Sequence, residues 1–529
     1  MVETGHHHQH PPAPAAAGPP PVSSMAISTK PTWSPAEQLH HLQYCIHSNP
    51  SWHETVVLAF QHYIVMLGTT VLIANTLVTP MGGDAEDKAR VIQTILFMSG
   101  INTLLQTLIG TRLPTVMGVS FAYVLPVLSI IRDYNDGQFQ TEKQRFRHTM
   151  RTVQGSLIIS SFVNIIIGYG QAWGNLISFT ACKLCGDWST NADSADPLTT
   201  SLPFYLRLLL RNIQTILERY ALLVCLALIW AFAAILTVSG AYNNVSVATK
   251  LSCRTDRSFL MSAAPWISIP YPFQWGTPIF RASHVFGMFG AAIVASAEST
   301  GVFFAASRLA GATAPPAHVV SRSVGLQGVG VLLEGIFGSI TGNTASVENV
   351  GLLGLTRIGS RRVVQVSTGF MIFFAIFGKF GAFFASIPLP IFAGVYCILL
   401  GIVAAVGISF IQFTDNNSMR NMYVVGVSLF LSLSIAQYFI SNTTRAGYGP
   451  VRTAGGWFND ILNTIFASAP FVAIIVATVL DNTLEARHAI NDRGIAWWKP
   501  FQHRNGDGRN EEFYSFPLRV GEYLPTRFH

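Results

Sequence analysis

Between two long apolar segments the chain carries the stretch Glu348-Asn349-Val350-Gly351-Leu352-Leu353-Gly354-Leu355-Thr356-Arg357. A charged side chain at the centre of a bilayer costs about 2.5–3.5 kcal/mol unless it faces protein or a water-filled cavity. An acid beside an amide within such segments therefore indicates a substrate or ion site. The stretch predicts a polytopic membrane protein with a binding site inside the membrane.

The composition agrees with a membrane protein. Half of the 529 residues are hydrophobic and 11% are charged, whereas soluble domains carry about 25% charged residues. The net charge of +7 is spread over short basic clusters such as Arg361-Arg362. Clusters of this kind fit cytoplasmic membrane flanks better than a nucleic-acid surface, so no nucleic-acid partner is expected.

Neither the N-terminal region nor the cysteines predict a metal or a cofactor. Residues 1–50 are rich in Pro, Ala, His and Ser and lack the apolar core of a signal peptide, so a disordered cytoplasmic tail is expected. Its run His6-His7-His8-Gln9-His10 is interpreted as low complexity. Cys182 and Cys185 have the spacing of half a zinc site, but no second pair accompanies them.

Apolar stretches of about 20 residues are long enough to cross the hydrocarbon core as helices. Two of them are interrupted, at 114–121 by Pro114 and Gly118 and at 344–351 around Glu348. Paired interruptions in two halves are typical of inverted-repeat transporters, in which broken helices hold the substrate near the midplane. The expected spans are 56–79, 91–110, 113–131, 153–173, 220–240, 285–306, 323–341, a broken segment at 344–356, 364–386, 390–410, 420–440 and 463–481.

Basic residues predict the orientation. Arg308, Arg322 and Arg420 fall in loops that alternate counting puts on one face, which the positive-inside rule makes cytoplasmic. The basic stretch 132–151 is expected to be a loop on the opposite face, against this rule.

The pattern acid-Asn-x-Gly-x4-Thr-basic at 348–357 resembles the signature of the nucleobase-ascorbate transporter family, and plant members look closest over 283–370. The resemblance runs from about Pro50 to the C-terminal region. It implies an all-α, seven-plus-seven inverted repeat in which a core carries substrate past a gate, an elevator mechanism. The expected parts are a tail (1–50), the core (51–173 and 283–386), the gate (174–282, with an extracellular loop at 241–282, and 387–483) and a cytoplasmic C-terminal tail (484–529).

The chain departs from the family pattern between Trp173 and Tyr220. Two gate spans would be expected there, but the stretch is polar, and only Leu202–Ile216 resembles a helix. That helix is amphipathic and better suited to a membrane interface than to crossing. Two gate spans are therefore expected to be missing.

The resemblance implies a site built from both halves. Glu298 and Glu348 would hold the polar edge of a purine or pyrimidine, and burial of Glu298 in an apolar span favours its neutral form, which suits proton coupling. Ser120 and Phe121 would lie opposite, with a backbone N–H for a substrate carbonyl and a ring to stack on a flat heterocycle. Asn349 is expected to support the site by satisfying backbone groups.

The first span adds two candidates. Gln61 would orient the substrate, and His62 is a second candidate proton carrier, although a lone His in an apolar helix is more often a satisfied core residue. Four further residues are expected to support the site: Glu334, Gly351, Thr356 and Arg357.

The leading hypothesis is proton-coupled uptake of a purine such as xanthine or uric acid across the plasma membrane. Ascorbate carriers of the family resemble Pro-Asn where this chain has Glu348-Asn349, and an acid would repel the ascorbate anion. An ascorbate carrier and a truncated paralogue that does not transport are the alternatives. An enzyme is not expected, since no nucleophile and base stand at catalytic spacing. The expected partners are the substrate, protons and membrane lipid. The resemblance is also compatible with a homodimer.

Overall fold

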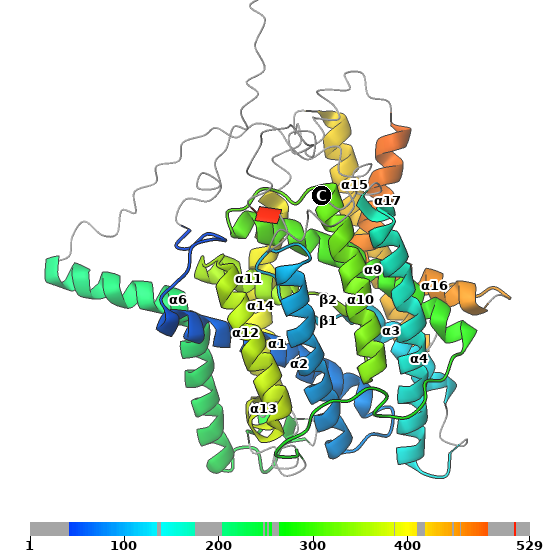
Figure 1. Ribbon diagram of the computed structural model, residues 1–529, viewed down its shortest axis with the longest axis horizontal. Helices are drawn as coiled ribbons and strands as arrows, with labels where there is room; N and C mark the ends of the chain where they lie inside the picture. Colours follow the sequence, from blue (N-terminus) through cyan, green and yellow to red (C-terminus); the bar gives the residue numbers. More distant parts are fainter. Residues whose placement is uncertain are drawn as a thin grey trace, which may run out of the picture.

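The computed structural model is almost entirely helical (Figure 1). It describes residues 42–134, 139–174, 204–246, 249–250, 253–255, 264–385, 387–409, 418–446, 449–454, 456–484 and 513–514. The elements are α1 (Trp52–Val78), α2 (Ala85–Leu108), β1 (Met117–Val119), η2 (Phe121–Tyr123), α3 (Val124–Asp133), α4 (Glu142–Tyr169), α6 (Phe204–Val238), α9 (Ala282–Leu309), α10 (Ala317–Phe337), β2 (Asn343–Ala345), α11 (Val347–Thr356), α12 (Arg361–Ile376), α13 (Gly378–Ala385), α14 (Leu389–Ser409), α15 (Met419–Ala446), α16 (Gly456–Phe466) and α17 (Ala469–Thr483).

The predicted all-α polytopic membrane fold is confirmed. Among the described residues, eight helical segments are long and apolar enough to cross a membrane: Trp52–Val78, Ala85–Leu108, Glu142–Tyr169, Arg219–Val238, Ala282–Leu309, Ala317–Phe337, Leu389–Ile408 and Met419–Thr443. Eight of the expected spans fall on these segments.

Both predicted interruptions are extended. Strands β1 and β2 pair antiparallel, with Gly118 opposite Thr344. The continuous span expected over 113–131 is therefore wrong, because the chain there forms β1, the short η2 and the half-length α3. Gly118 permits the close approach of α1, since a Cβ there would lie 2.5 Å from the sulfur of Met66.

Two other expected spans are each divided into two helices. The stretch 364–386 is divided between α12 and α13 at Phe377, whose backbone leaves the helical region at φ −89° and ψ 78°. The stretch 463–481 is divided between α16 and α17, and Pro470 lies in the first turn of α17. Proline lacks an N–H and disfavours helical geometry in the residue before it, which explains a break there.

The basic stretch 132–151 is not the loop that was expected. Thr141 caps α4, which begins at Glu142 and places the following basic residues on a helix. Arg145 donates from Nε to the carbonyl of Met81 (3.3 Å), and Arg151 donates to the carbonyl of Thr277 (2.7 Å). Arg145 and Arg151 thus hold neighbouring loops, and the side of the membrane on which they lie stays a prediction.

The packing repeats between the two halves. Each half runs through two long helices, a strand followed by a half-length helix, and a further helix: α1, α2, β1–α3 and α4, then α9, α10, β2–α11 and α12. Helix α10 packs along α4, and α12 packs along α2 (Figure 1). The second helix of each repeat thus packs on the fourth helix of the other, and the paired strands lie between them.

Helix α6 bends at Tyr220, whose φ and ψ of −114° and 15° are not helical. Its first part runs across the direction of its second part in Figure 1. The expected amphipathic helix at 202–216 overlaps this first part from Phe204 onward.

Residues 42–50 pack on the helices, although a disordered tail was expected to residue 50. The amide of Gln43 donates to the carbonyl of Arg357 (3.1 Å), and that of Ile46 donates to the carbonyl of Ala310 (3.1 Å). Ile46 is buried among apolar side chains. This segment therefore packs on the helices.

Candidate functional site

The two strands hold the starts of two helices in place. Beyond the ladder, the amide of Ser120 donates to the carbonyl of Gly342 (3.1 Å), and the amide of Ser346 donates to the carbonyl of Val116 (2.8 Å). Ser120 is the N-cap of η2, which continues into α3, and Ser346 is the N-cap of α11. A helix start carries positive partial charge and unpaired N–H groups, so this crossing favours carbonyl or anionic groups.

Ser346 organises the predicted acid and amide. Its hydroxyl accepts from the backbone N–H (3.3 Å) and the Nδ2 (3.0 Å) of Asn349, and it donates to Oε2 of Glu348 (2.9 Å). Glu348 is thereby held in the first turn of α11, where an acid is stabilised by the helix dipole. The hydroxyl was not among the predicted residues, although a serine just before an apolar helical run is a recognised start signal.

His62 reaches the same place from α1. Its Nδ1 lies 3.0 Å from Oδ1 of Asn349, and both side chains are buried. Because Nδ2 of Asn349 already donates to Ser346, Oδ1 is the acceptor and Nδ1 of His62 carries the hydrogen. His62 therefore has the contacts of a satisfied core histidine that supports Asn349.

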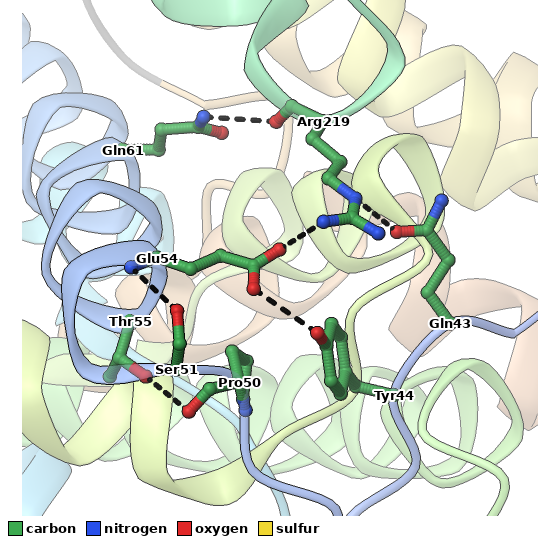
Figure 2. A network of polar contacts seen from close by, with 8 residues as sticks. All are labelled: Gln43, Tyr44, Pro50, Ser51, Glu54, Thr55, Gln61 and Arg219. Atoms are coloured by element: carbon green, nitrogen blue, oxygen red, sulfur yellow. Dashed lines mark hydrogen bonds and ion pairs between the residues drawn. The ribbon is translucent and has the colours of Figure 1, made fainter. Parts of the chain in front are cut away.

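Gln61, the preceding residue, points to a different helix. Its Nε2 donates to the carbonyl of Arg219 (3.0 Å), next to the bend of α6 (Figure 2). Close by, the guanidinium of Arg219 pairs with Glu54 and donates from Nε to Gln43 (2.6 Å). The hydroxyl of Tyr44 donates to the same carboxylate of Glu54 (3.1 Å). In this conformation Gln61 joins α1 to α6.

Glu298 comes to the site from α9. Its neighbour Ser299 bonds the strand, since its hydroxyl accepts from the amide of Ala345 (3.0 Å) and lies 3.0 Å from the hydroxyl of Thr344. Glu298 itself is half-buried, as is Glu348. Glu348 lies in the first turn of α11, and α11 packs against α9, the helix that carries Glu298. The structure thus brings together the two acids that were predicted from different spans.

Two aromatic residues accompany the start of α3. Phe121 keeps 47% of its surface exposed, as stacking on a ligand requires. Tyr123 is fully buried, and its hydroxyl has no hydrogen-bond partner within the described part of the chain. A Cβ on Gly342 would lie 2.9 Å from this hydroxyl, which places Tyr123 beside the residue that precedes β2. Tyr123 was not predicted, because nothing in its local sequence distinguishes it from a core aromatic residue.

The predicted supporting residues make structural contacts, and their role at the site stays a prediction. Nδ2 of Asn102 in α2 donates to buried Glu334 in α10 (2.9 Å). Gly351 allows α14 to approach, since a Cβ there would lie 2.4 Å from the carbonyl oxygen of Leu399. The hydroxyl of Thr356 donates to a backbone carbonyl of its own helix (2.8 Å). Arg357 ends α11 in the left-handed region, at φ +57°.

No group of three or more metal-ligating side chains occurs in the ranges that the structure describes. Cys182, Cys185 and the histidine run at 6–10 lie outside those ranges. The expectation that these residues hold no metal therefore stays untested.

Comparison with known proteins finds relatives along the whole chain. The sequence profile described as the Permease family matches residues 53–180 and 194–441. Nucleobase-ascorbate transporter 3 of Arabidopsis thaliana is 82% identical over 550 positions that cover the whole of both chains. Nucleobase-ascorbate transporters 2 and 1 of the same plant are 51% and 50% identical; each aligns with 93% of this chain, and the alignments cover 97% and 98% of those proteins.

Proposed function

The chain belongs to the nucleobase-ascorbate transporter family of permeases, which are membrane carriers and not enzymes, and we propose on this premise that it takes up a purine nucleobase together with a proton. The observation that carries the proposal is that α9, which carries Glu298, and the start of α11, which carries Glu348, meet at the paired strands. One acid comes from the first helix of the second repeat, and the other from its broken segment.

The chemistry of the site suits a neutral heterocycle. Xanthine, or uric acid in its neutral, protonated form, carries ring N–H groups, which a carboxylate accepts well, and carbonyl groups, which the helix start at Ser120 favours. The exposed ring of Phe121 offers a face for stacking. Asn349 already donates to Ser346 and accepts from His62. We therefore assign Asn349 to support, and we keep Gln61 as a ligand for a conformation in which it has left Arg219.

Ascorbate is the alternative substrate, because the relatives' names include it. An ascorbate anion would have to approach two carboxylates, which costs free energy unless both are protonated. Purine selectivity therefore follows from the pair of acids.

The same pair supports proton coupling. Two carboxylates that repel each other are stabilised when one of them takes up a proton. We assign this proton to Glu298, because Glu348 is fixed by the hydroxyl of Ser346 and by the start of α11. His62 is less suited, since its Nδ1–H is engaged by Asn349.

Movement is proposed to follow the elevator scheme, at the plasma membrane. The core of this scheme comprises 51–173 and 283–386, and the gate comprises 174–282 and 387–483, with a homodimer as the assembly the family implies. The alignment with the 82% identical relative exceeds the chain by 21 positions, whereas two complete spans need about 40 residues. The missing gate spans thus remain a prediction.

The test is uptake in yeast that lacks its own purine and ascorbate carriers. Labelled xanthine and uric acid are expected to accumulate, and labelled ascorbate is not. Glu298→Gln and Glu348→Gln are expected to abolish purine uptake. Glu86→Gln is the matched control, because the Glu86 side chain is 46% exposed and pairs with Arg90 one turn along α2. Uptake of ascorbate without purine, or equal loss in all three variants, would refute the proposal.

A further inference from the structure

Two aromatic residues of the C-terminal region, Phe513 and Tyr514, are buried against the helices, each with 3% of its surface exposed (Figure 1, red). They belong to an apolar cluster that includes Ile46, Leu113 and Val319. The ring of His47 stacks on that of Phe513, with centroids 5.3 Å apart and planes inclined by 12°. Residues from the far end of the chain therefore complete a core of the membrane domain.

Two buried arginines bind the main chain of this dipeptide. Nη2 of Arg322 donates to the carbonyl of Tyr514 (3.1 Å), and Nη2 of Arg361 donates to the carbonyl of Phe513 (3.2 Å). The hydroxyl of Tyr514 donates to the carbonyl of Thr313. Because burial raises the pKa of the Tyr514 phenol, the hydroxyl keeps the hydrogen that this bond needs. Side chains and backbone of the dipeptide are thus both recognised.

The same two guanidinium groups also hold the loop that enters β1. Arg322 donates to the carbonyl of Gly110 from Nε (3.1 Å) and Nη2 (2.7 Å), and Nε of Arg361 donates to the carbonyl of Arg112. A buried cation needs several acceptors to offset its lost hydration, and the dipeptide supplies one acceptor to each arginine. The dipeptide and the loop 109–116 are therefore coupled through shared donors.

The position of these contacts links both repeats. The loop 109–116 leads into β1 of the first repeat, Arg322 lies in the first turns of α10, and Arg361 begins α12 directly after α11. None of the residues proposed to hold the substrate takes part in these contacts. The chemistry is that of a peptide site, with an aromatic pocket and donors aimed at main-chain carbonyls. The sequence places two acids, Glu511 and Glu512, next to the dipeptide, which suits a basic pocket.

We propose that His47, Thr313, Arg322 and Arg361 form a peptide-binding pocket whose ligand is the chain's own Phe513-Tyr514, and that its occupation fastens the loop 109–116 to the start of α12. The pocket is an interaction surface distinct from the substrate site. Its ligand is attached to the same chain, so the high effective concentration keeps the pocket filled against a free peptide.

The test measures binding of a fluorescent peptide with the sequence of residues 510–516 to the purified full-length chain in detergent. The variant Phe513→Ala/Tyr514→Ala is expected to bind the peptide saturably, and the unaltered chain at least about tenfold more weakly because its pocket is occupied. A peptide with alanine at both aromatic positions is expected to bind neither. No saturable binding to a folded double variant would overturn the proposal.

A matched pair of variants tests the pocket itself. In the double-variant background, Arg361→Gln is expected to weaken peptide binding at least about tenfold, the loss typical of a buried charged donor. Arg362→Gln is the control, because Arg362 lies over the ring of Trp52 instead (3.5 Å from the centroid). Hydrogen exchange over 109–116 is expected to quicken in the double variant and to slow again when peptide is added. Equal effects of the two arginine variants, or unchanged exchange, would contradict the assigned pocket.

A further measurement keeps a full-size side chain at residue 513. It tests the proposal even if the double variant does not fold. A photoreactive benzoylphenylalanine in place of Phe513 keeps an aromatic ring in the pocket. On illumination it is expected to crosslink within the same chain to residues 42–50 or to the first turn of α12. Crosslinks only elsewhere, or only between two chains, would refute the intramolecular site. None of these readouts depends on transport, so they fail or succeed independently of the proposed function.

Discussion

Replacing Gly351 by alanine tests whether the position of α11 sets substrate affinity. A Cβ at this residue would lie 2.4 Å from the carbonyl oxygen of Leu399 and 2.9 Å from its carbonyl carbon. Both atoms belong to the backbone of α14 and cannot rotate away. The clash must therefore be relieved by separating α11 from α14, and Glu348 lies one turn before Gly351 on α11.

Two opposing effects set the magnitude. Alanine is favoured over glycine within a helix by about 1 kcal/mol, whereas inserting a methyl group into tight packing costs about 1–3 kcal/mol. Because the contact is with backbone, the upper part of this cost applies, and the net penalty is about 1–2 kcal/mol. If the substrate needs α11 in its original place, this penalty corresponds to a roughly 5- to 30-fold loss of affinity.

The assay is binding of labelled xanthine to purified protein in detergent, with the melting temperature measured in parallel. Gly401→Ala, in the helix α14 against which α11 packs, is the control. Its added Cβ would have no atom within 4 Å. Gly401→Ala is expected to keep its affinity within about threefold and not to lower its melting temperature. Equal affinity of Gly351→Ala and the unaltered chain would refute the reasoning.

Three further predictions concern proton coupling, the ion pair between Glu54 and Arg219, and the gate spans. Uptake is expected to rise as external pH falls and to collapse with a protonophore, and Glu298→Gln is expected to lose this dependence; residual uptake that still follows pH would exclude Glu298 as the proton carrier. Glu54→Gln or Arg219→Gln is expected to speed hydrogen exchange at the start of α6, because each removes one side of a partly buried ion pair, and the charge-swapped double variant should restore slow exchange. A chain with two spans inserted within 174–219 is expected to transport faster than the chain as it stands, with equal purine binding; equal uptake by both would show that the gate is complete without them.

The sequence predicted the membrane class and the broken segments because both depend on local composition. Charges are too costly in a bilayer to occur by chance, so Glu348 marked its segment. Glycine and proline also mark a break without long-range information, and Gly118 lies in a strand as the interruption implied. The divisions at Phe377 and before Pro470 were missed because an apolar run has the same composition whether it forms one helix or two.

Contacts between elements that are far apart in the sequence could not be predicted from the sequence pattern. Nothing near Gln61 indicates that its amide donates to Arg219, 158 residues away. The burial of Phe513 and Tyr514 is equally invisible, since their neighbours in sequence are polar and the arginines that bind them look like ordinary cytoplasmic flanks. Such contacts depend on which surfaces the fold brings together, which local composition does not encode.

The two consecutive residues Gln61 and His62 show how the site is joined to α6. Neighbouring residues on a helix differ in direction by about 100°, so α1 presents His62 to Asn349 and Gln61 to the carbonyl of Arg219. In the elevator scheme proposed above, α1 and α11 move together with the core and α6 stays with the gate, so we expect the movement to keep the first contact and break the second. We expect the Gln61 amide to become available as a donor to the substrate when it releases the carbonyl of Arg219. The variant Gln61→Ala should therefore affect both purine affinity and hydrogen exchange at the bend of α6. A change in one of these readouts without the other would show that α1 does not couple them.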